Sequence, residues 1–199
     1  MRKKIITLLV LCCLLSISVN CFAEGGTNDV FTLRNGITFG MTEKEIKSRE
    51  TLKLKAGSSY GPGEVAGIGN STVQYVLKDG KLNSVFMELG EGKNYSNTKS
   101  DYKNLEIQLT LKYGEGLSLK SGEKSLYCGS WLETCETLAN VARLTGSTFD
   151  CDYHEWIVYT NDGFVVIDHV INYVKGVNGS SWNHVLEYTY YPVTANNDI

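Results

Sequence analysis

The sequence predicts a small α+β domain, with an antiparallel β-sheet built from hairpins and two or three helices packed on one face. Asp79-Gly80 separates two runs of alternating apolar residues, which is the strongest short signal for a hairpin, and Asn161-Asp162-Gly163 separates two further runs. Thr42-x-x-Glu45 and Ser130-x-x-Glu133 each have the spacing of a helix capping box. The 12 Tyr and three Trp residues suit a protein rich in strands.

Residues 1–23 have the pattern of a secretory signal peptide. A positive start at Arg2, Lys3 and Lys4 precedes an apolar run that is too short for a membrane span, and small residues stand before a cleavage site after Ala23. We therefore expect a secreted or periplasmic protein without an integral membrane span. The alternative is a lipid anchor at Cys21, although Asn20 is not the small residue that such a signal prefers before the cysteine.

Residues 24–199 are long enough for one domain with its own core. Loss of the three basic residues of the signal changes the formal net charge from −3 to −6. Because the chain is acidic and has no cluster of Lys and Arg, we expect no nucleic-acid partner. The repeated order of a capped helix and an Asp-Gly hairpin leaves a second organisation open, with two halves at residues 30–95 and 128–191.

The other elements follow from shorter patterns. The first capped helix is predicted to run from Glu43 to about Leu54. The stretch Gly57–Asn70 is rich in glycine and lacks the Gly-Lys-Ser/Thr ending of a phosphate-binding loop, which predicts a surface connection. The predicted hairpin covers residues 73–89, and the later strands are expected at residues 156–160, 164–174 and 184–191.

Residues 101–113 fit two patterns. Apolar residues alternate with polar ones, as in a strand, at Leu105, Ile107, Leu109, Leu111 and Tyr113. A helical stripe is also present, at Tyr102, Leu105, Leu109 and Tyr113. Ser100 or Asp101 can cap such a helix and Gly114 can end it. The content of Leu, Gln, Lys and Glu also favours a helix, which is our prediction.

Three cysteines remain after residue 23, at Cys128, Cys135 and Cys151, so at most one internal disulfide forms. Cys128 and Cys135 would lie about 10 Å apart across helical turns, which is too far for a disulfide. Cys151 can approach Cys135 if the chain turns back after Gly146, so we expect that pair and an unpaired Cys128. No spacing of His and Cys resembles a zinc site, and we expect neither a metal nor a cofactor.

The stretch around Cys128 most resembles an enzyme site. A thiolate just before a helix N-terminus is stabilised by the helix dipole, and a downstream histidine could act as its base: His154, His169 or His184. The stretch is similar to the Cys-Gly-Ser-Cys-Trp signature of papain-like proteases, but Trp131 occupies the position of the nucleophile. A cysteine hydrolase using Cys128 and His169 is therefore the alternative function. A buried, hydrogen-bonded His169 among apolar neighbours is the favoured interpretation of that residue.

The stretch Ile37-Thr-Phe39-Gly40-Met41-Thr42-x-x-Glu45-Ile46 resembles the strand-to-helix entry of small exported bacterial domains of the BamE type and the β-lactamase-inhibitor-protein type. The resemblance implies helices on one face of an antiparallel sheet and a function in binding other proteins. No binding residue is carried over from these domains. Since the sequence contains no complete catalytic constellation, we predict a non-enzymatic secreted or cell-envelope protein whose partner is another protein.

Overall fold

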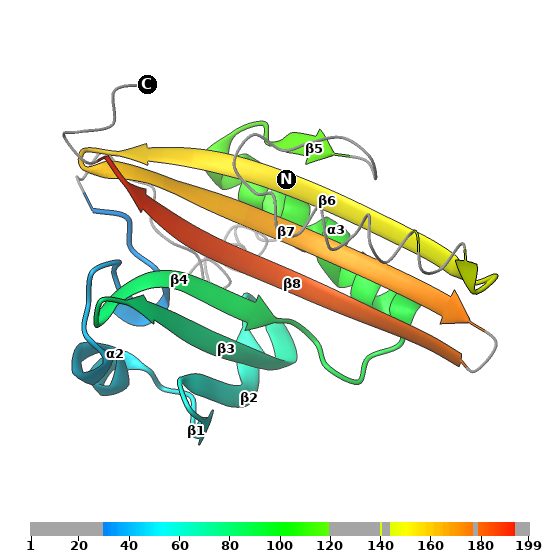
Figure 1. Cartoon of the computed structure of the whole chain (residues 1–199), viewed down its shortest axis with the longest axis horizontal. Coiled ribbons are helices and arrows are strands. Elements are labelled where there is room, and N and C mark those ends of the chain that lie inside the picture. Colours follow the sequence, from blue (N-terminus) through cyan, green and yellow to red (C-terminus); the bar gives the residue numbers. More distant parts are fainter. Residues whose placement is uncertain (1–29, 120–139, 141–143, 177–178, 194–199) are drawn as a thin grey trace, which may run out of the picture.

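The protein forms one antiparallel sheet of eight strands in the order β1-β2-β3-β4-β8-β7-β6-β5 (Figure 1). The computed structural model describes residues 30–119, 140, 144–176 and 179–193. The strands are β1 (Leu54–Ala56), β2 (Ser59–Val65), β3 (Ile68–Lys78), β4 (Lys81–Glu88), β5 (Leu117–Leu119), β6 (Thr148–Thr160), β7 (Gly163–Gly176) and β8 (Gly179–Pro192). The described part also contains a 3-10 turn, η2 (Arg34–Gly36), and the helices α2 (Glu43–Arg49) and α3 (Tyr95–Tyr113).

The predicted α+β class, with two or three helices packed on one face, is wrong. The described residues form eight strands against two α-helices, which is closer to an all-β fold. Only α3 of the two contacts the long strands β6, β7 and β8 extensively, whereas the short α2 lies beside the other end of the sheet (Figure 1). The helix expected after Ser130 falls mostly on residues outside the described part.

The protein contains more strand than predicted because segments without a clear alternating pattern also form strands. The glycine-rich stretch Gly57–Asn70, predicted to be a surface connection, forms β2 and the start of β3. Tyr60 and Val65 of β2 are buried there, although polar and glycine residues separate them. The strands β6 and β8 also begin earlier than predicted, at Thr148 and Gly179. Backbone pairing with β7 continues through their polar residues, so hydropathy does not mark where these strands start.

The capping box at Thr42 is confirmed. The Thr42 hydroxyl accepts a hydrogen bond from the Glu45 amide, and the Glu45 carboxylate accepts one from the Thr42 amide at 2.7 Å. The helix is shorter than predicted because the next residue, Glu50, turns inward. Its fully buried carboxylate accepts hydrogen bonds from Arg34 Nη1 at 3.0 Å and from the Leu52 amide at 2.8 Å, and it also binds the Tyr75 hydroxyl. These contacts join η2, α2 and β3.

The two predicted hairpins are confirmed. In the first, Asp79 and Gly80 connect β3 to β4 with φ angles of 52° and 75°, the left-handed conformation that favours Asp-Gly in two-residue turns. In the second, Asn161 and Asp162 connect β6 to β7, and Thr160 pairs with Gly163 across the turn. This second register determines which side chains of β6 and β7 lie opposite each other.

Residues 101–113 are helical, as predicted. The helix starts earlier than expected, at Tyr95, because the Asn94 side chain accepts a hydrogen bond from the Asn97 amide at 3.0 Å. Gly114 follows the last helical residue at a φ of 86°. The inner stripe of α3 is buried against the sheet, at Thr98, Tyr102, Leu105 and Leu109.

One apolar cluster links the first described residues to the rest of the sheet. Phe31, Leu33, Ile37 and Ile46 pack with buried residues of β2, β3 and β4, with Leu105 and Leu109 of α3, and with residues of β6, β7 and β8. The sheet is therefore continuous from β1 to β5. The hairpins β3–β4 and β6–β7 lie on opposite sides of β8, and the division into two halves stays a prediction.

Candidate functional site

The residues proposed from the sequence as a site are only partly described. Cys128 and Cys135 lie outside the described residues, so both the cysteine hydrolase and the Cys135–Cys151 disulfide stay predictions. Cys151 is half-buried in β6. It packs against a small apolar cluster of Tyr153, Val170 and Val185, on the sheet face that α3 does not cover. His169 is fully buried in β7.

The three histidines meet on the sheet face that α3 covers. His154 in β6 lies directly opposite His169 in β7. His184 in β8 is two residues from Leu186, the partner of His169 in the pairing of β7 with β8. The Nε2 atoms of His169 and His184 are 2.8 Å apart, which is a hydrogen bond. We name His154, His169 and His184 the histidine row.

Burial keeps the inner two rings of the histidine row neutral. His169 is 0% exposed and His184 is 1% exposed. Loss of hydration lowers the pKa of His169 well below its usual value and lowers the pKa of His184 to about 4. In a neutral pair, one Nε2 carries a proton and donates a hydrogen bond to the other Nε2. The Nδ1 atom of each ring has no hydrogen-bond partner within the described part of the chain.

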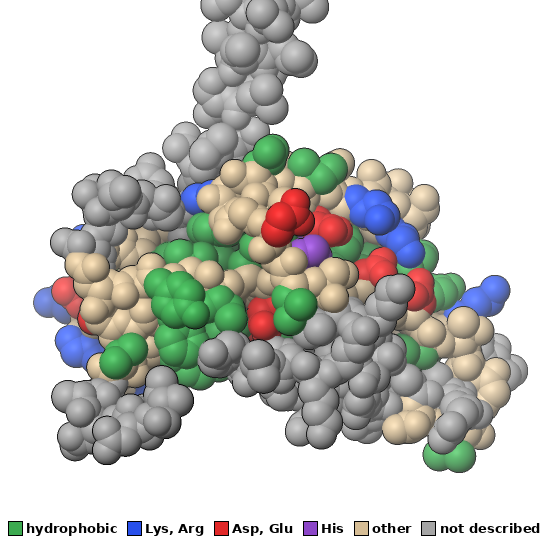
Figure 2. Space-filling model, turned by 90° about the horizontal axis from the view of Figure 1, so that it is seen from above, with side chains coloured by type: hydrophobic (Ala, Val, Ile, Leu, Met, Phe, Trp, Pro, Cys, Tyr) green, Lys and Arg blue, Asp and Glu red, His purple; other side chains and the backbone are tan. Residues whose placement is uncertain are grey.

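Aromatic side chains and an acid surround the histidine row. The Tyr102 ring of α3 stacks on His169 with ring centres 4.1 Å apart, and the His154 ring stacks on Trp156 at 4.4 Å. Nδ1 of His154 lies 3.4 Å from Oε1 of Glu106. Histidine surface is visible from above, with acidic side chains next to it (Figure 2). His154 is 9% exposed, so only this outer end of the row reaches solvent.

Sequence reasoning missed the histidine row because its members are 15 residues apart. The signal that could have found it is the turn between β6 and β7. Thr160 pairs with Gly163, and His154 and His169 each lie six residues further from that turn, so a two-residue turn places them opposite each other. The same alternation separates His169 from Asp168, which faces the other side of the sheet, as the strand geometry predicts.

The sheet face that α3 does not cover carries a row of acidic residues behind the histidine row. Glu155, Asp168 and Glu187 lie directly opposite one another on β6, β7 and β8. The Tyr153 hydroxyl contacts Glu155 Oε2 at 3.0 Å and also contacts Asp168. Glu155 and Asp168 are buried. The sheet separates these acids from the histidine row, so the two rows do not form acid–base pairs with each other.

A cavity of about 200 Å³ lies beside β8, where β4 ends. Residues 88–92 form one wall and residues 180–184 form the other, including the buried His184 at the inner end of the histidine row. The cavity is smaller than the pockets of about 300–1,000 Å³ that hold drug-sized ligands. It therefore has room for a single side chain or a similarly small group.

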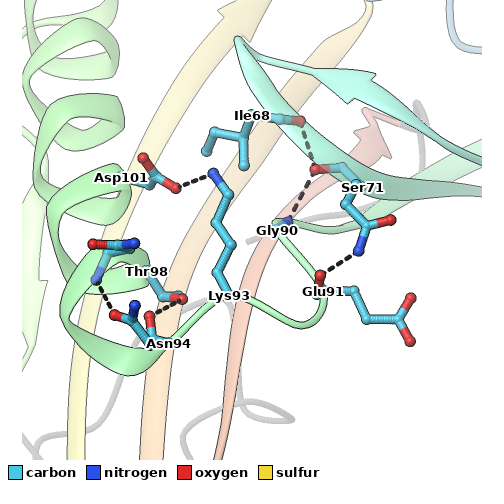
Figure 3. Close-up of polar contacts among 10 residues, drawn as sticks. Ile68, Ser71, Gly90, Glu91, Lys93, Asn94, Thr98 and Asp101 are labelled. Atoms are coloured by element: carbon cyan, nitrogen blue, oxygen red, sulfur yellow. Dashed lines mark hydrogen bonds and ion pairs between the residues drawn. The ribbon is translucent and has the colours of Figure 1, made fainter.

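The loop wall of this cavity is held by contacts to β3 and α3 (Figure 3). The Gly90 amide donates to Ser71 Oγ at 3.0 Å, and the Asn70 side-chain amide donates to the Glu91 carbonyl. Lys93 Nζ forms an ion pair with Asp101 Oδ2 of α3 at 2.7 Å. Because hydrogen bonds connect the wall to β3, and the ion pair of the adjoining Lys93 connects the same loop to α3, the cavity is formed without a ligand.

The outward face of α3 carries exposed apolar side chains. Ile107 is 58% exposed and Leu111 is 82% exposed. These residues are four positions apart, so their side chains are neighbours on the helix surface. We name Ile107 and Leu111 the outer stripe of α3.

Comparisons with protein families, with curated proteins and with solved structures find no match to this chain. The resemblance to domains of the BamE and β-lactamase-inhibitor-protein types therefore stays a prediction. Within the described ranges, no group of three or more His, Cys, Asp or Glu residues is arranged to hold a metal ion. Neither helix of the described part has the length and apolarity needed to cross a lipid bilayer.

Proposed function

We propose that this chain is a non-enzymatic secreted or cell-envelope protein that binds another protein through the outer stripe of α3. The exposure of Ile107 and Leu111 is the observation that carries the proposal. Large apolar side chains that stay in water next to each other on a rigid helix are typical of surfaces that a partner covers.

The sequence of α3 supports this interpretation. A helix that only covers the sheet needs apolar residues on one side, and Leu105 and Leu109 provide them. The additional residues Ile107 and Leu111 produce the strand-like alternation and do not contribute to the core. Their presence is explained if a second protein buries them.

The proposed location and partner class rest on the sequence. The signal peptide predicted at residues 1–23 supports export, and the expected net charge of −6 favours a protein over a nucleic acid as partner. The cysteine hydrolase has no observation in its favour among the described residues, since His169 is closed to solvent under Tyr102.

Site-specific crosslinking tests the outer stripe of α3. A photoreactive amino acid replaces Ile107 or Leu111 in the producing cell, and the control position is Lys78, an exposed residue beside the β3–β4 turn. We expect one discrete crosslinked protein from positions 107 and 111 and none from position 78. An excess of the native chain should compete with the crosslink, whereas the variant Ile107→Ser/Leu111→Ser should not. Equal crosslinking from all three positions contradicts the proposal.

A further inference from the structure

We propose that the open edge of β8 and the cavity beside it bind an extended, basic segment of a partner protein. The segment adds to the sheet as a further antiparallel strand and places one Lys or Arg side chain in the cavity. This site is separate from the outer stripe of α3 and goes beyond the function proposed above.

Among the described strands, β8 has a partner on only one side over its first residues. The pairing of β8 with β7 covers Gly179 to Pro192, whereas its pairing with β4 covers only Val185 to Thr189. Beyond that point, the Leu89 amide still donates to the His184 carbonyl at 2.8 Å. Figure 1 shows β8 continuing past the end of β4. No described strand lies next to this part of β8 on the β4 side.

The alternation of a strand determines which backbone groups this edge presents. The His184 carbonyl points to the β4 side, so the N–H and C=O groups of Trp182 and Ser180 point to the same side. Both residues line the cavity. A row of unpaired backbone groups on a sheet edge is the template that an added strand uses.

The charge of the cavity indicates a basic occupant. Glu88 and Glu91 both line it, and neither carboxylate has an ion pair with a cation of the described residues. Lys93, which directly follows the loop wall, is already paired with Asp101 at 2.7 Å. A Lys or Arg side chain entering the cavity would gain charge-assisted hydrogen bonds to these carboxylates.

Charge also favours a different protein over a second copy of this chain as the occupant of the β8 edge. Pairing two β8 edges would bring two sets of Glu88 and Glu91 together, and each mature chain is expected to carry a net charge of −6. Like charges that face each other across paired strands are destabilising. A basic strand from another protein removes this repulsion.

Binding of a labelled peptide to the purified protein tests the site. The probe is a short fluorescent peptide of alternating lysine and valine, and the control peptide has glutamate in place of lysine. We expect fluorescence anisotropy to rise with the lysine peptide only. In NMR spectra, the amide signal of Trp182 should shift and become protected from exchange with solvent.

Two variants separate the roles of the charge and the edge. Glu88→Gln/Glu91→Gln removes the charge, and Ser180→Pro removes an N–H that points to the open side and is therefore not bonded to β7. Each should weaken binding of the lysine peptide by about tenfold or more, since each removes hydrogen bonds made only with the ligand. Circular dichroism checks that both variants fold.

Several other results would contradict the proposed site. Unchanged affinity in Glu88→Gln/Glu91→Gln, equal binding of the glutamate peptide, or no binding at all would overturn the proposal. A dimer of the native protein that Ser180→Pro dissociates would assign the edge to a second copy instead. The variant Ile107→Ser/Leu111→Ser should bind the lysine peptide normally, so failure at α3 and failure at β8 are distinguishable.

Discussion

The two ends of α3 rest on the same sheet face but bury different chemistry. Near its C-terminus, Leu105 and Leu109 join the main apolar cluster, and Tyr113 stacks on Phe31 with ring centres 6.1 Å apart. Nearer its N-terminus, Tyr102 stacks on His169, one of two buried histidines. We name these regions the apolar end and the histidine end.

The difference separates two sources of stability. At the apolar end, burial of hydrocarbon surface stabilises the fold at any pH. At the histidine end, two imidazoles are buried without full hydrogen bonding, so the fold favours their neutral forms. The same helix is therefore held by a pH-independent contact at one end and by a pH-dependent contact at the other. The following three predictions test this contrast, starting with the largest effect.

Leu109→Ala should give the largest loss of stability. Leu109 is 0% exposed, and its truncation leaves a cavity between α3 and the sheet that should lower the free energy of unfolding by about 3 kcal/mol. The matched control is Leu111→Ala, two residues away and 82% exposed, with an expected change within about 0.5 kcal/mol. Urea unfolding at neutral pH measures both. Similar losses in the two variants would show that α3 is not packed through its inner stripe.

Acidification should lower the stability of the protein through the histidine end. The pKa of His184 is about 4 in the folded protein and about 6.5 in the unfolded chain, so the unfolded chain binds more protons between these values. Stability is therefore complete above pH 6.5 and declines as the pH falls toward 4, by about 3 kcal/mol from His184 alone. The pKa of His169 is lowered by burial as well and adds to this decline.

The double variant His169→Gln/His184→Gln isolates this effect. Its free energy of unfolding should be lower at neutral pH and should change less than that of the native protein between pH 6.5 and 4.5. Neighbouring charged groups, namely Asp101, Lys93 and His154, are kept in both proteins, so their titration cancels in the comparison. The same pH dependence in both proteins would place its origin outside the histidine pair.

Lys99→Gln should have the smallest effect. Lys99 Nζ lies 3.6 Å from carboxylate oxygens of both Asp150 and Asp152 at the N-terminal side of α3, and all three side chains are partly exposed. Such pairs contribute about 1 kcal/mol or less and are screened by salt. The difference from the native protein should disappear in concentrated sodium chloride. A larger, salt-insensitive loss would mean that Lys99 is held by packing of its stem.

Local signals in the sequence predicted the elements that depend on neighbouring residues. The capping box at Thr42, the turn at Asp79-Gly80 and the helix ending at Gly114 all form as expected. The glycine-rich β2 and the polar start of β6 were missed, because pairing with a neighbouring strand stabilises them and their own hydropathy pattern does not. This is also why the predicted balance of helix and strand was wrong.

The candidate sites were less predictable than the elements. The outer stripe of α3 was visible as an unexplained alternation, and it became a surface only once residues 101–113 were known to be helical. The histidine row depends on the register of three strands, and the cavity depends on where β4 ends against β8.

The sequence by itself determined the turns, the caps and the helical state of α3, because hydrogen bonds within a few residues decide each of them. Only the tertiary structure decided that His184 joins His154 and His169 on the face covered by α3, and that no described strand pairs with the first residues of β8 on the β4 side. The histidine row depends on the registers of three consecutive strands, and the open edge depends on β4, which is far from β8 in the chain and ends beside it. The order of β8 in the sheet, between β4 and β7, is a property of long-range pairing that no local pattern specifies.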